Sequence, residues 1–83
     1  MSQGEIVERV VRYVVTEIVD RPEEVELTLV EEGPEEVVAE VRTAKSDMGR
    51  VIGRRGRVAR AIRTVAQAAA DEEGLHSGVE FID

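Results

Sequence analysis

The residues whose types and spacing could do chemistry are Gly53, Arg54, Arg55 and Gly56, two glycines that bracket two arginines. Glycine adopts left-handed backbone angles and lets another chain come close, because it carries no Cβ atom. A helix is predicted to begin after the second glycine, and the first amides of a helix lack internal partners and carry partial positive charge. Guanidinium groups beside them can each form two parallel hydrogen bonds with a phosphate. This pattern therefore predicts a phosphate-binding loop.

The net charge around this loop points to the same class of ligand. Residues 42–63 contain eight basic residues and one acid, a net charge of +7, whereas the rest of the chain contains three basic and seventeen acidic residues, a net charge of −14. Electrostatic interactions in physiological salt are screened over roughly 8–10 Å. A polyanion that approaches this segment therefore meets the local positive charge rather than the −7 of the whole chain. We predict a nucleic-acid ligand at this segment.

The first half of the chain predicts a helix and two strands. Valines at three- and four-residue steps, behind a capping box formed by Ser2 and Glu5, indicate an amphipathic helix that ends before Pro22. Apolar and polar residues then alternate over 24–30 and again over 36–43, as in half-buried strands. The glycine and proline between these two segments predict an antiparallel hairpin.

The second half predicts two helices and a strand. A short helix capped by Ser46 or Asp47 is expected to end at Ile52, and a longer helix to span 57–73, with a glycine placed to end it. A last strand is expected over 78–82. The apolar face of the long helix is predicted to be centred on Val58, Ile62, Val65 and Ala69.

These elements predict one α+β domain that spans residues 1–83, in the order α-β-β-α-α-β. Three strands and three helices make a two-layer sandwich, in which the helices cover the three-stranded sheet. The core is expected to consist of aliphatic side chains, since the chain has one tyrosine and one phenylalanine. Tyr13 and Phe81 are assigned to packing rather than to base stacking, because neither belongs to the basic segment.

The sequence does not predict an enzyme. Its carboxylates, Glu73 among them, fall in predicted turns and exposed edges, where solvated charge is the ordinary explanation. His76 is the only histidine, in a predicted loop, and the chain has no cysteine, so neither a catalytic triad nor a metal site is expected. The loop also lacks the Lys-Ser/Thr ending of a P-loop, and no cofactor is expected. No apolar run approaches the ~20 residues that span a bilayer and no secretory leader is recognised, so we expect a cytoplasmic protein without a membrane partner.

The segment 51–62, VIGRRGRVARAI, resembles the signature of the KH (K-homology) RNA-binding domain. The order of the elements resembles the type II arrangement, in which an additional helix and strand precede the core. Through the segments PEEV at 22–25 and DMGRVIG at 47–53, the chain is similar over essentially its whole length to the small bacterial KH-domain protein A (KhpA) family. Ala59 is a departure, because many KH domains carry a large aliphatic residue at that position.

The resemblance implies a cytoplasmic protein that binds single-stranded RNA and acts as an RNA chaperone or post-transcriptional regulator. In KH domains such a loop clamps the backbone of about four nucleotides, and we expect Ile52 and the arginine stems to form a floor for the bases. The resemblance also implies a homodimer, a heteromer with a larger KH protein of the Jag type, and a link to cell elongation and division. The candidate RNA-binding residues are Gly53, Arg54, Arg55, Gly56, Ile52, Arg50, Arg57 and Arg60.

Protein association is the alternative function. The alanines on the shoulders of the long helix are small enough to let another helix pack closely, and the same alanines would also pack that helix closely on its own sheet. The sequence leaves both interpretations open. Association is compatible with RNA binding, because a dimer places two weak sites on one particle. The alanines concerned are Ala59, Ala61, Ala66, Ala68 and Ala70.

Overall fold

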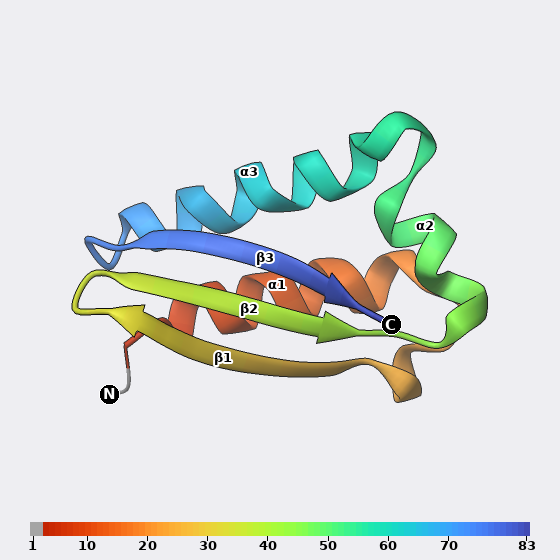
Figure 1. The fold of residues 1–83 in the computed structure, drawn as a ribbon, viewed down its shortest axis with the longest axis horizontal. Helices are drawn as coiled ribbons and strands as arrows, with labels where there is room; N and C mark the ends of the chain where they lie inside the picture. Colours follow the sequence, from red (N-terminus) through yellow and green to blue (C-terminus); the bar gives the residue numbers. More distant parts are fainter. Residues whose placement is uncertain (1–2) are drawn as a thin grey trace.

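The computed structural model describes residues 3–83 and has two layers, a three-stranded sheet and a layer of helices on one of its faces (Figure 1). The α+β class and the order of helices and strands are therefore confirmed. Short 3-10 turns precede β1, α2 and α3. The main elements are α1 (Glu5–Ile18), β1 (Glu26–Gly33), β2 (Glu36–Arg42), α2 (Met48–Ile52), α3 (Arg57–Asp71) and β3 (His76–Ile82).

The sheet is mixed, with strand order β1-β2-β3. The β1–β2 hairpin is antiparallel, and it contains an irregularity between Glu31 and Gly33. β2 runs parallel to β3, with Ala39 opposite Val79. Parallel neighbouring strands need a long crossover connection. Here the connection consists of α2, the loop at residues 53–56 and α3. This crossover places the loop at one end of the molecule, away from the turn of the β1–β2 hairpin (Figure 1).

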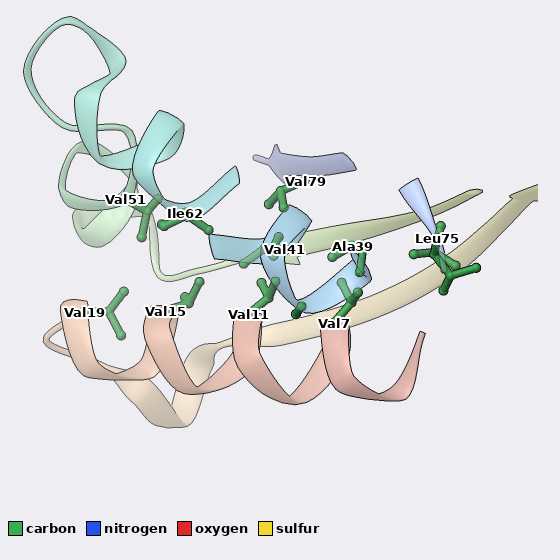
Figure 2. Packing of buried hydrophobic residues seen from close by; sticks show 14 residues of the cluster. Val7, Val11, Val15, Val19, Ala39, Val41, Val51, Ile62, Leu75 and Val79 are labelled. Carbon is green, nitrogen blue, oxygen red and sulfur yellow. The ribbon is translucent and has the colours of Figure 1, made fainter. Parts of the chain in front are cut away.

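The core lies between the sheet and the two long helices, and it is built from valine and alanine. Val7, Val11 and Val15 of α1 lie in a row beneath Ala39 and Val41 of β2 (Figure 2). The opposite wall comes from α3, whose small side chains let the helix approach α1 and the sheet closely. The buried residues of α3 are Ala59, Ile62, Ala66, Ala69 and Ala70.

The buried face of α3 differs from the predicted one. Val65 was expected near its centre, but 42% of this residue is exposed. The helix is rotated so that Ala66 and Ala70, expected on a shoulder, are fully buried. Ile62 and Ala69 of the predicted face are buried as expected, and the close approach to α1 and the sheet favours the smaller alanines over Val65.

The start of α1 is stabilised from the far end of the chain rather than by a local capping box. Ser2 lies outside the described residues, and the N-cap is Gly4, with φ 89° and no side-chain capping bond. The backbone N–H groups of Gly4, Ile6 and Val7 instead donate to the carboxylate of Glu73, over 3.0–3.3 Å. Glu73 was expected to be a solvated surface charge, and that expectation is wrong. A carboxylate stabilises this helix end, because it accepts hydrogen bonds from N–H groups that have no partner in the helix and lies at the positive end of the helix dipole.

The starts of two strands also differ from the prediction. β1 begins at Glu26 rather than at residue 24, because a 3-10 turn occupies Pro22–Glu24. β3 begins at His76, so this histidine is an exposed strand residue and not part of a loop. The glycine expected to end α3 does so at Gly74, where φ is 69°. None of the helices described within residues 3–83 is long and apolar enough to cross a bilayer.

Candidate nucleic-acid interface

The loop between α2 and α3 has a backbone that requires glycine at its first position. Gly53 has φ 76° and ψ 169°, a region that is essentially restricted to glycine. A Cβ atom on Gly53 would lie 2.4 Å from Cγ2 and 2.8 Å from the backbone nitrogen of Val58. Both the backbone angles and the available space therefore exclude other residues at Gly53.

The second half of the loop is left-handed and open. Arg55 (φ 57°, ψ 25°) and Gly56 (φ 73°, ψ 16°) both have positive φ angles, and Arg55 is the one non-glycine residue of 3–83 that does. A left-handed conformation costs an L-residue roughly 1–2 kcal/mol. A Cβ on Gly56 would meet none of the described atoms within 4 Å, so the backbone there is accessible. The loop thus stores strain at an exposed site, which is typical of ligand-binding backbone.

The backbone amides without a partner lie earlier in the chain than predicted, within the loop rather than at the start of α3. The N–H of Gly53 donates to the carbonyl of Gly49 at 2.9 Å, that of Gly56 to Gly53 at 3.1 Å, and that of Arg57 to Arg54. The start of α3 therefore has fewer unpaired amides than expected. Within residues 3–83, the N–H groups of Arg54 and Arg55 have no hydrogen-bond acceptor. The loop itself offers two backbone donors to a ligand.

The arginines of the loop and of α3 form no ion pair with the described residues 3–83. Arg9, Arg12 and Arg21, outside the basic segment, each have a carboxylate within 3.4 Å. The exposed arginines of the loop and of α3 have no carboxylate within 4.0 Å in the described part of the chain. In a protein with eighteen acidic residues this leaves an unbalanced positive surface along the start of α3. The residues concerned are Arg54, Arg55, Arg57, Arg60 and Arg63.

Two contacts fix the position of α2 and therefore of the loop. Asp47 is fully buried, and its carboxylate accepts hydrogen bonds from the backbone N–H groups of Asp20 and Arg21, both at 3.0 Å. Ser46 or Asp47 was expected to cap α2, and the structure places Asp47 at the N-cap position without a capping hydrogen bond from its side chain. Arg50, a candidate RNA-binding residue, forms an ion pair with Asp20 at 3.0 Å. This network attaches α2 to the end of α1.

The other candidate residues surround the loop. Ile52 is half-buried at the end of α2. Arg57 and Arg60 are exposed on the first turns of α3, and Nη2 of Arg60 reaches back to the carbonyl of Arg55 at 3.4 Å. Ala59, the departure from the KH pattern, is 2% exposed and contributes to the core instead of to an open surface. The structure thus brings the candidates together at one end of the molecule, although Arg50 has an intramolecular partner.

The positive surface continues into a hollow between α3 and β3 that sequence reasoning did not identify. The hollow has a volume of about 600 Å³, and Arg63 in its wall donates from Nε to the carbonyl oxygen of Val79 in β3 at 3.1 Å. The signal in the sequence was the three- and four-residue spacing of polar residues after Arg60. Its lining includes Arg60, Arg63, Thr64, Gln67, Asp71 and Ser77.

Comparisons with known proteins agree with this architecture. The profile of the family described as "KhpA/KhpB, KH domain" matches residues 8–81. A protein named RNA-binding protein KhpA from Borreliella burgdorferi is 40% identical over 73 residues, which cover 88% of each chain. Proteins of the same name from Clostridium acetobutylicum (46% over 65 residues, covering 78% of this chain and 85% of the relative) and Caldanaerobacter subterraneus (39% over 79 residues, 95% and 99%) are also similar.

Proposed function

This chain belongs to the KhpA/KhpB KH-domain family, which is not a family of enzymes, and on that premise we propose that it binds single-stranded RNA through the sugar–phosphate backbone. The proposed grip is the Gly53-Arg54-Arg55-Gly56 loop. The observation that carries the proposal is the set of loop and α3 arginines that have no carboxylate partner among residues 3–83, next to two backbone amides that have no acceptor there. Relatives named RNA-binding proteins support the same ligand class.

The loop would act mainly on phosphates. The amides of Arg54 and Arg55 donate to one phosphate, and their guanidinium groups contact the same phosphate or the next one. Gly56 lets the backbone of the RNA approach, because the space above it is open. Arg57 and Arg60 then extend the positive surface along the first turns of α3. Such contacts give affinity with little sequence preference.

Ile52 and Arg50 have supporting roles in this proposal. The half-buried side chain of Ile52 would provide an apolar surface on which a base next to the loop can lie. Arg50 would act partly through its ion pair with Asp20, which holds α2 in place, and partly through its exposed charge. Long-range attraction needs no direct contact, because it depends on the local field rather than on one pair of atoms.

The test is a double charge reversal in the loop. We expect Arg54→Asp/Arg55→Asp to lose RNA retention in a filter-binding assay with a short unstructured oligonucleotide. The control is Arg9→Asp/Arg12→Asp, which makes the same change in net charge on the exposed face of α1. A loop variant that folds and binds as well as the parent protein would remove the loop from the site. A control that loses as much affinity would reduce the proposal to a general charge effect.

We propose homodimer formation as a second property. Ala61, Val65 and Ala68 are exposed on α3 at steps of four and three residues, and they form an apolar stripe beside the buried face. A second copy of the chain is the proposed occupant, and a heteromer with a larger Jag-type KH protein could use the same stripe. Sedimentation of the parent protein and of Val65→Glu tests this. A parent that sediments as a monomer at tens of micromolar would contradict the homodimer. The cytoplasmic location, the RNA-chaperone role and the link to cell elongation stay predictions.

A further inference from the structure

We propose that Arg63 contacts a base of the bound RNA and favours cytosine or guanine over adenine or uracil. This inference rests on the proposed RNA-binding function, since it assigns a base-selective contact to the same surface. Base-selective contacts need a side chain whose donors are held in a fixed direction. Arg63 meets this condition, and the exposed arginines of the loop do not.

Two contacts hold the plane of the Arg63 guanidinium group. Its Nε donates to the carbonyl oxygen of Val79 at 3.1 Å, and its central carbon lies 5.9 Å from the centre of the Phe81 ring. Both partners belong to strand β3, which is hydrogen-bonded to β2 and therefore rigid. Within residues 3–83 the two Nη atoms have no hydrogen-bond partner. The end of the side chain thus presents fixed, unused donors.

The position of Arg63 suits a base rather than the phosphates at the loop. Arg63 follows Gly56 by seven residues, which corresponds to about 10 Å along the helix. A segment of about four nucleotides clamped at the loop would extend past it. Arg63 and Arg60 line the same open hollow between α3 and β3, and we place the base over this hollow.

The arrangement of free donors selects among the four bases. Two parallel N–H donors match two adjacent acceptors, which guanine offers at O6 and N7 and cytosine at O2 and N3. Adenine instead presents an acceptor next to its amino donor on both accessible edges. Uracil has a donor, N3–H, between its two carbonyl groups. A guanidinium fork therefore forms both hydrogen bonds with cytosine or guanine and one with the other bases.

The neighbouring polar residue cannot take this role. The side-chain amide of Gln67 donates to the carbonyl of Leu75 at 3.1 Å and accepts from the N–H of Ser77 at 3.0 Å. It therefore pairs with the free edge of β3 as a peptide group of another strand would. This closes the edge next to Arg63 against strand addition. It also leaves Arg63 as the side chain of the hollow with both a fixed plane and free donors.

The experiment measures affinity by fluorescence anisotropy for four labelled RNA octamers. One is U8, and the others carry CC, GG or AA at the two central positions. We expect the parent protein to bind the CC and GG octamers at least about fivefold more tightly than U8 and the AA octamer. Arg63→Lys keeps the charge and loses the fork, so we expect all four affinities to fall within about twofold of one another. Arg9→Lys on α1 is the matched control, and it should keep the parent's preference.

The outcomes separate this inference from the proposed function. Equal affinity of the parent protein for all four octamers, or a preference that survives in Arg63→Lys, would overturn the inference and leave backbone binding intact. Failure of the parent protein to bind any octamer would overturn both. If Arg63→Lys does not fold, as judged by its urea unfolding curve, Phe81→Leu decides. Loss of the ring near the guanidinium group should reduce the preference at least about twofold, and an unchanged preference refutes the role of the held guanidinium plane.

Discussion

The two glycines of the loop provide the sharpest prediction, because the same substitution should have different effects at the two positions. In Gly53→Ala the new methyl group enters a backbone region that is essentially glycine-only and would lie 2.4 Å from Cγ2 of Val58. Backbone strain of about 1–3 kcal/mol and overpacking of about 1–3 kcal/mol then add. We expect the free energy of unfolding to fall by about 2–6 kcal/mol.

In Gly56→Ala the methyl group meets open space, and the cost is the left-handed conformation alone. That cost is about 1–2 kcal/mol, and the reduced freedom of the unfolded chain offsets part of it. We expect a loss of about 1 kcal/mol. RNA affinity should nevertheless fall about tenfold, because the methyl group stands where the RNA backbone approaches and one charge-assisted hydrogen bond of about 1.5 kcal/mol is lost.

Urea unfolding followed by circular dichroism measures both variants under identical conditions. For a domain of this size, the Gly53→Ala variant should also melt at least about 10 °C below the parent protein. Equal destabilisation of the two variants would refute the argument from the Val58 contact. A Gly56→Ala variant that keeps full RNA affinity would refute the open backbone as the point of approach.

Three further predictions concern strain, charge and the supports of the loop. Arg55→Gly should leave the free energy of unfolding unchanged or raise it by about 1 kcal/mol, because it relieves the left-handed conformation of Arg55. RNA affinity should fall. A lower free energy of unfolding in urea would contradict this prediction. A plot of the logarithm of RNA affinity against the logarithm of salt concentration should have a slope of about −3. This is the value for four phosphates neutralised by Arg54, Arg55, Arg57 and Arg60. A slope near zero in anisotropy titrations would exclude phosphate binding. Asp47→Ala should lower the free energy of unfolding by about 2–4 kcal/mol, because two backbone amides lose a charged acceptor; a loss below about 1 kcal/mol in urea would show that water replaces it.

The sequence was sufficient for the loop and for the order of the elements, because both depend on local patterns. The positive φ angles of Gly53 and Gly56 were expected, because glycine between two helical segments commonly adopts them. The alternation of residue types along β2 correctly predicted that Val37, Ala39 and Val41 are buried on one face of the sheet. Propensity and spacing act over a few residues, so they predict elements that a few residues determine.

The contacts that hold the loop in place were not predictable in this way. Glu73 stabilises the start of α1 from 66 to 69 residues away, and Asp47 binds amides 26 and 27 residues away. Phe81 was set aside because it lies outside the basic segment, yet the packing of α3 on β3 places it under Arg63. Such pairs are formed by tertiary packing, and no local pattern in the sequence marks them.

Val65 shows a different limit. Its spacing fits the apolar stripe of α3, and the helix could have been buried on that side. The structure buries Ala66 and Ala70 instead, since small side chains allow a closer approach to α1 and the sheet. The exact centre of the buried face depends on the shape of the partner surface, which the sequence of one helix does not contain.

The most direct test of the central claim is an NMR titration of the ¹⁵N-labelled parent protein with a short single-stranded RNA. The account predicts that the backbone amide signals of Arg54 and Arg55 shift most, because these N–H groups are unpaired in the free protein and would donate to phosphate in the complex. Smaller shifts should extend along α3 as far as Arg63. Largest shifts on the open face of the sheet, with the signals of the loop unchanged, would contradict it.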